Sequence, residues 1–138
     1  MTSVTIPDSI TTFGECVFDG CQNLQYNEFD NAKYLGNAVN KHLVLVKASS
    51  TDITSCSIDV KCAFVLDKAF RGRRSLTSIT IPDSVKSIGL YAFSGCTGLT
   101  KIDFNGTKAQ WETVEKGNEW SNNTGDFTVY CTDGTISK

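Results

Sequence analysis

Long apolar stretches are missing from this sequence. No run reaches the roughly eighteen residues that a membrane-spanning helix needs. The opening Met1-Thr2-Ser3-Val4 also lacks the charged and apolar regions of a secretion signal. The sequence also has no large excess of charge of either sign, because the net charge is −2 and the pI is near 5.3. We therefore expect no nucleic-acid binding and no membrane insertion.

Histidine occurs once, as His42, and this scarcity argues against most catalytic groups. A Ser-His-Asp or Cys-His arrangement would need His42 to meet its partners far from any predicted cleft. Glycine-rich phosphate loops are absent, and Glu112 and Glu115, on one exposed helix face, show no sign of a paired-carboxylate site. We predict a protein without catalytic residues or cofactors, and not an enzyme.

No C-x-x-C pair occurs among the six cysteines, at positions 16, 21, 56, 62, 96 and 131. With one histidine, a zinc site would need four of these scattered thiols to converge, so we expect no metal site. At 138 residues and 40% hydrophobic content, the chain has enough apolar residues for one domain with its own core. A disulfide framework is therefore not required.

An internal repeat is the strongest signal in the sequence. The segment 3–14, SVTIPDSITTFG, is echoed by 78–89, SITIPDSVKSIG, at a spacing of 75 residues. Of the 22 paired positions from 3 to 24, 11 are identical. A second spacing of 23 residues joins Ala69-Phe70-x-Gly72 to Ala92-Phe93-x-Gly95. The unit is thus about 23 residues long, with boundaries at 1–23, 24–52, 53–75, 76–98 and a partial 99–107.

Each unit is predicted to be one coil of a solenoid. Ile79 and Ile81 alternate with Ser78 and Thr80, which is typical of a half-buried strand. The Pro82-Asp83-Ser84 segment then turns the chain. Val85, Ile88, Ala92 and Phe93 follow at spacings of three and four, which predicts one or two inward-facing helical turns. Since no unit can bury its apolar face alone, about five such coils should stack around a shared core.

The repeat also explains the cysteines. Cys56 takes the place of Ile79, Cys62 that of Val85, and Cys21 matches Cys96. A free cysteine behaves as a small buried apolar residue, so these positions favour reduced structural thiols over disulfides. The alignment leaves Cys16 and Cys131 open.

The long second unit is predicted to contain a hairpin. Tyr34-Leu35-Gly36 and Leu43-Val44-Leu45-Val46 flank a loop of about six residues, 37–42, with His42 at its tip. The loop could serve recognition, but a solvated turn is the simpler interpretation.

The C-terminal segment, 108–138, departs from the repeat and is predicted to cap the stack. Residues 107–117 indicate a short helix that begins at a Thr107 cap, and 127–131 alternate as a strand before an Asp133-Gly134 turn. Because atypical terminal units cover exposed core and strand edges, we interpret Trp111 and Trp120 as part of this cap rather than as a ligand platform.

The segment 76–98, LTSITIPDSVKSIGLYAFSGCTG, closely resembles the BspA-like (Treponema-type) leucine-rich repeat. Residues 31–48 look like the hairpin unit of this family, and 108–134 look like its closing segment. The resemblance implies a leucine-rich-repeat-like solenoid, β-rich with some helix, from large surface proteins of bacteria or protists that bind host matrix, other microbes or epithelial cells. It implies no catalytic residues and no cofactor. Arg73 departs from the pattern, because it stands where the unit-end cysteine belongs.

Two surfaces are candidates for partner binding. The first is the outward strand face, where Ser3/Thr5, Ser55/Ser57, Ser78/Thr80 and Lys101/Asp103 should align in adjacent coils without an aromatic side chain for sugar stacking. The second is a basic corner formed by Lys68, Arg71, Arg73 and Arg74. Either set could instead be an ordinary solvated surface.

We therefore expect a non-enzymatic protein-binding or adhesion module of a cell-surface or extracellular protein. The alternative is a free-standing cytoplasmic inhibitor or adaptor built on the same repeat. In either case the partner is another protein or a host or microbial surface component.

Overall fold

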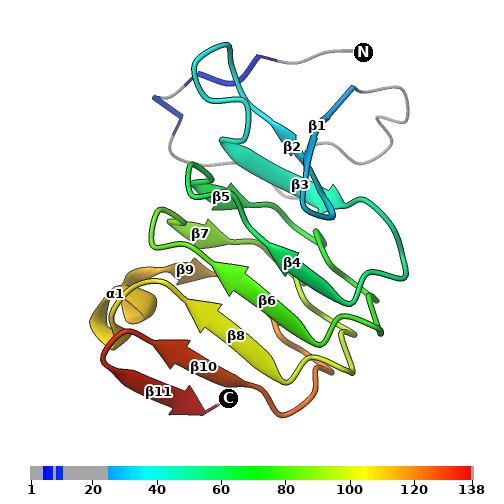
Figure 1. The fold of residues 1–138 in the computed structure, drawn as a ribbon, viewed down its shortest axis with the longest axis vertical. Helices are drawn as coiled ribbons and strands as arrows, with labels where there is room; N and C mark the ends of the chain where they lie inside the picture. Colours follow the sequence, from blue (N-terminus) through cyan, green and yellow to red (C-terminus); the bar gives the residue numbers. More distant parts are fainter. Residues whose placement is uncertain (1–4, 8, 11–24, 138) are drawn as a thin grey trace.

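Two β-sheets face each other along a stack of coils in the computed structural model, which describes residues 5–7, 9–10 and 25–137 (Figure 1). The first sheet has five strands in the order β11-β10-β8-β6-β4. Its strands are β4 (Ser55–Ser57), β6 (Ser78–Ile81), β8 (Lys101–Phe104), β10 (Thr128–Cys131) and β11 (Gly134–Ser137). The first four are parallel, and β11 returns antiparallel to β10. This arrangement confirms the predicted leucine-rich-repeat-like solenoid.

The second sheet has six strands in the order β1-β2-β3-β5-β7-β9, of which only the hairpin formed by β2 and β3 was predicted. It comprises β1 (Asn27–Phe29), β2 (Ala32–Leu35), β3 (Val44–Ala48), β5 (Phe64–Val65), β7 (Ser87–Ile88) and β9 (Glu115–Lys116). The prediction of helical turns across 85–93 is therefore wrong for this segment. Lys86 N–H donates to Ala63 O and Gly89 N–H to Val65 O, so the ladder between coils satisfies backbone groups that a single helical turn would satisfy poorly.

The core lies between the sheets and continues from coil to coil. Ile79, Ile81, Ile88 and Phe93 are each at most 1% exposed, as predicted, whereas Ser78 and Thr80 lie half-exposed on the outer side. The rings of Phe70 and Phe93 stack in parallel with centroids 5.1 Å apart. The inward direction of Val85, Ala92 and Phe93 was thus correct even though their backbone is not helical.

The predicted hairpin is present as β2 and β3, with β1 as an additional antiparallel strand. The position of His42 was predicted wrongly, because it does not lie at a solvated tip. Its ring is half-buried, 4.7 Å from the centroid of Tyr34, and its Nδ1 lies 2.9 Å from a carboxylate oxygen of Asp59. The aromatic and acidic partners draw the imidazole toward the stack.

The β1–β2 turn covers the outer edge of β4. Asp30 accepts a hydrogen bond from Ser57 N–H, and the Asn31 amide donates to Ser55 O. Thr5 was predicted to continue the row of Ser55 and Ser57. It pairs instead with Gly36, beside the hairpin. Ser3, which was expected beside Thr5, lies outside the described residues.

The C-terminal segment begins with helix α1 (Lys108–Thr113), shorter than predicted. Thr107 is its N-cap, and a capping box joins Thr107 and Gln110. Val114 ends the helix in an extended conformation, so Glu115 lies in β9 and not on a helix face with Glu112. The predicted strand before the Asp133-Gly134 turn is present as β10.

The described cysteines are Cys56, Cys62, Cys96 and Cys131, and all four are free thiols, the first three buried. This agrees with the predicted core positions. Burial raises the pKa of Cys56 and of Cys62 to about 12 and that of Cys96 to about 11. Cys16 and Cys21 lie outside the described residues.

Candidate binding surfaces

The outer face of the five-stranded sheet presents side chains in two registered rows. Parallel pairing places Ser55, Ser78, Lys101 and Thr128 side by side, and the same register aligns Ser57, Thr80, Asp103 and Tyr130. The structure thus brings together six of the eight residues predicted for this face, since Thr5 pairs beside the hairpin and Ser3 lies outside the described residues. Two further strands, β10 and β11, widen the face beyond the prediction.

A small charged and aromatic group interrupts the hydroxyl rows at β8 and β10. Lys101 Nζ lies 3.5 Å from Asp103 Oδ2 and 5.4 Å from the centroid of the Tyr130 ring. Tyr130 is 45% exposed, so the prediction of a face without aromatic side chains is wrong. The prediction missed Tyr130 because the last coil is longer than the repeat: Val129 pairs with Ile102, which lies 27 residues earlier rather than 23.

The basic corner follows a column of turns with left-handed backbone. One residue in each of three successive coils has positive φ at the first bend: Lys68 (61°), Tyr91 (56°) and Glu119 (54°). A second column has positive φ at Gly72 (74°), Gly95 (78°) and Asn123 (57°). The corner is therefore a repeated, well-defined element of backbone rather than an irregular loop.

The corner cations Arg71 and Arg73 are engaged within the protein. The Arg71 guanidinium lies 5.5 Å from the centroid of the Tyr91 ring, and a hydrogen bond with Glu119 raises the pKa of Tyr91. Arg73 is half-buried, and its Nη1 donates to Arg71 O. Arg73 Nε is buried without a hydrogen-bond partner among the described residues. The corner is consequently less available to an acidic partner than its charge suggests.

A third polar cluster joins the hairpin to the turn after β4. Asp59 approaches His42 Nδ1, and Asp59 N–H donates to the Tyr34 hydroxyl at 3.1 Å. Burial raises the pKa of Asp59, but hydrogen bonds from Lys61 N–H and from His42 outweigh it and leave this pKa below its ordinary value. The cluster fixes the hairpin against the stack, and we assign it a structural role.

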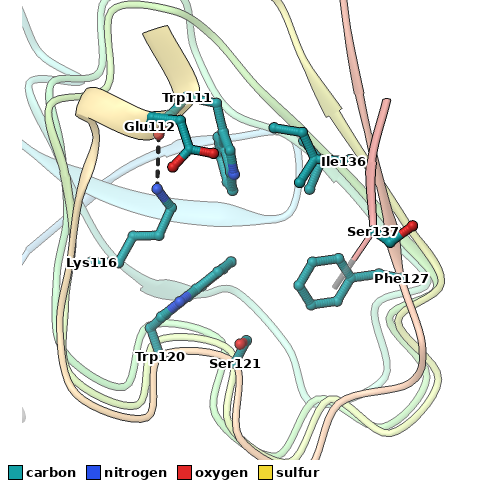
Figure 2. Close-up of a pocket in the computed structure, with 9 residues that line it drawn as sticks. Trp111, Glu112, Lys116, Trp120, Ser121, Phe127, Ile136 and Ser137 are labelled. Atoms are coloured by element: carbon teal, nitrogen blue, oxygen red, sulfur yellow. Dashed lines mark hydrogen bonds between the residues drawn. The ribbon is translucent and has the colours of Figure 1, made fainter. Parts of the chain in front are cut away.

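The C-terminal end of the stack contains a cavity of about 280 Å³ (Figure 2). Apolar and polar side chains line it in similar measure: Trp111, Glu112, Lys116, Trp120, Ser121, Phe127, Val129, Ile136 and Ser137. Lys116 Nζ donates to Trp111 O at 2.8 Å and lies 4.3 Å from the centroid of the Trp111 ring. Burial lowers the pKa of Lys116. Sequence reasoning placed both tryptophans in the cap but missed this cavity, because it is formed by four segments that meet only in the fold.

Metal ligation has no support in the part of the chain that the structure describes. No group of three histidine, cysteine, aspartate or glutamate side chains there lies close enough to hold an ion.

The parallel strand ladder, the 23-residue register and the buried column between two sheets define a leucine-rich-repeat solenoid. The family described as the BspA type leucine rich repeat region matches residues 1–43 and 47–115, in six copies. The chain belongs to this family.

Among solved structures, the chain is similar to a leucine-rich repeat protein of T. pallidum, with 22% sequence identity and a TM-score of 0.42. The similarity covers 56% of this chain and 41% of that one. The chain therefore spans less than half of the length of this relative. A comparison with curated proteins finds no match.

Proposed function

We propose that this chain is a non-enzymatic adhesion module that binds another protein through the outer face of its five-stranded sheet. Leucine-rich-repeat modules generally bind proteins, and proteins of this family are typically not enzymes. The observation that carries the proposal is the register of β4, β6 and β8, which lines up six polar side chains over three coils: Ser55, Ser57, Ser78, Thr80, Lys101 and Asp103. Short side chains on a regular sheet let a partner approach the backbone closely.

The corner of Lys68, Arg71, Arg73 and Arg74 is the competing surface. Contacts of Arg71 and Arg73 within the chain favour the sheet face over it. The corner also belongs to one coil, whereas the sheet face offers contacts from several.

The test requires a binding partner isolated with the whole chain as bait and then measured by titration. The combined change Ser55→Tyr, Ser78→Tyr and Thr80→Tyr should weaken binding by about tenfold or more, because bulky side chains keep a partner off the sheet. Thr132→Tyr, an exposed threonine in the β10–β11 turn, is the matched control. Circular dichroism verifies that each variant is folded.

Unchanged affinity in the folded triple variant would refute the sheet surface. If Arg71→Ser, Arg73→Ser and Arg74→Ser weakened binding instead, in a salt-dependent way, the corner would be the binding site.

A location at the cell surface is part of the same proposal. Proteins of this family are typically associated with the surface of the cell. Among the described residues, no helix has the length and apolar character needed to cross a bilayer. The genomic sequence upstream tests the location: an export signal supports adhesion, whereas a start codon in place without one favours the cytoplasmic inhibitor or adaptor.

A further inference from the structure

The C-terminal end of the stack has features of a second binding site, separate from the sheet face. Both sheets end there, at β9 and at β11, and α1 covers one side of the space between them (Figure 1). The rings of Trp111, Trp120 and Phe127 surround the remaining cavity (Figure 2). The cap thus buries Trp111, Phe127 and Val129 but leaves Trp120 and Ile136 partly exposed.

The cavity continues the packing columns of the coils before it. Phe70 stacks on Phe93, and the Phe93 ring meets Trp120 at 6.1 Å in an edge-to-face contact. Trp120 also lines the cavity, as does Ile136, the last inward side chain of the five-stranded sheet. A side chain that extended either the ring column or the row of inward sheet side chains by one position would lie in the cavity. Its volume of about 280 Å³ lies below the usual 300–1,000 Å³ of small-molecule sites, so it suits one large apolar side chain.

A strand edge lies beside the cavity. Among the described residues, β11 pairs only with β10, so the backbone groups on its outer side can receive an added strand. Extended peptides bind such edges through main-chain hydrogen bonds, and a neighbouring pocket selects a side chain. The occupant indicated by these two features is therefore an extended segment with an apolar anchor.

The charged side chains at this end indicate the charge of the segment that would bind there. Glu112 lines the cavity, and Glu115 and Asp126 are exposed on the same terminal coil. Two cations offset these carboxylates only in part: the exposed Lys108 lies against β11 at Gly134, and the Lys116 ammonium is half-buried and bonded to Trp111 O and Val114 O. A basic segment complements this surface.

We propose that the C-terminal end binds an extended basic segment of a partner protein, which adds to the edge of β11 and packs one large apolar side chain against Trp111, Trp120 and Phe127. The proposal does not depend on the sheet face, so either can fail alone.

A capped synthetic peptide, Lys-Thr-Val-Trp-Val-Thr-Arg, is the probe, measured by isothermal titration calorimetry against the full chain. Ser121→Phe fills the cavity and should weaken binding about tenfold or more, whereas Ser121→Ala should leave it unchanged. Ser137→Phe, at the other side of the cavity, provides a second blocking variant should Ser121→Phe fail to fold. Glu112→Gln should weaken binding and reduce its salt dependence.

Replacing both basic residues of the peptide with glutamate, or its tryptophan with alanine, should also abolish most of the binding. Equal binding of the basic and acidic peptides, or of the folded blocking variants and the parent chain, would overturn the proposal. Concentration-dependent dimers in sedimentation that Ser121→Phe abolishes would also overturn it, by assigning the cavity to a second copy of the chain. The Ser78→Tyr variant should bind the peptide normally, which separates this site from the sheet face.

Discussion

The carboxylate of Asp30 accepts a hydrogen bond of 2.8 Å from the backbone N–H of Ser57, a residue on the edge strand β4. Asn31 adds a 2.9 Å bond to the carbonyl of Ser55. Both turn residues have positive φ, 41° at Asp30 and 67° at Asn31, and this tight turn directs both side chains at the edge. An exposed strand edge invites pairing with other chains, and these two side chains occupy its polar groups.

Asp30→Ala should therefore destabilise the fold by about 1 kcal/mol and promote self-association, because it frees the Ser57 N–H. Urea unfolding measures the first effect and light scattering the second. Asp126→Ala, which changes an exposed carboxylate on the last coil, is the control and should have little effect on either. A stable, monomeric Asp30→Ala variant would show that the turn does not protect the edge.

Phe93→Ala should cost about 3–5 kcal/mol, since it leaves a cavity between the rings of Phe70 and Trp120. Denaturant midpoints measure the loss. Phe29→Ala is the matched control, because Phe29 is 42% exposed and its truncation creates no buried cavity. Equal midpoints for the Phe93 variant and the parent would mean that the ring column contributes no stability.

Cys56, Cys62 and Cys96 should react slowly with a thiol reagent in the native protein and rapidly after unfolding. Burial excludes the reagent and, by raising the pKa of each thiol, keeps it protonated near neutral pH. Labelling followed by mass spectrometry, without reductant, measures both states. Cys131, which is only half-buried, should react faster than the other three. Fewer than three of the six cysteines reacting after unfolding would reveal disulfides instead.

Gly72→Ala should destabilise the protein by about 1–2 kcal/mol through backbone strain alone. The φ of Gly72 is 74°, and an added Cβ would meet no atom within 4 Å, so steric overlap does not contribute. Gly72→Asn should recover part of the loss, because asparagine tolerates this conformation and Asn123 adopts it two coils later. Ser75→Ala is the nearby control. Equal losses in the alanine and asparagine variants would contradict the strain argument.

The repeat was sufficient to predict the outer sheet, because four-residue strands such as β6 show the alternation of Ile79 and Ile81 directly. It could not predict the second sheet, since β5, β7 and β9 have two residues each and show no period. Their formation depends on hydrogen bonds between coils, which local sequence does not encode.

The candidate binding surfaces, like the fold, were predicted only where the 23-residue repeat holds. The rows from Ser55 to Asp103 follow from the 23-residue period, whereas Tyr130 and the cavity lie in the last coil, where the period changes. The contact of His42 with Asp59 was missed because it joins the hairpin unit to the next coil.

The equal 23-residue steps between β4, β6 and β8 make each coil an interchangeable part. Duplicating 76–98 in tandem would add one strand and about 4.8 Å to the outer sheet without new packing chemistry. The length of the molecule can thus change by gene duplication, in steps of one coil. Each added coil repeats a weak contact, so the strength of attachment becomes a matter of copy number, through avidity, rather than of improving any single residue.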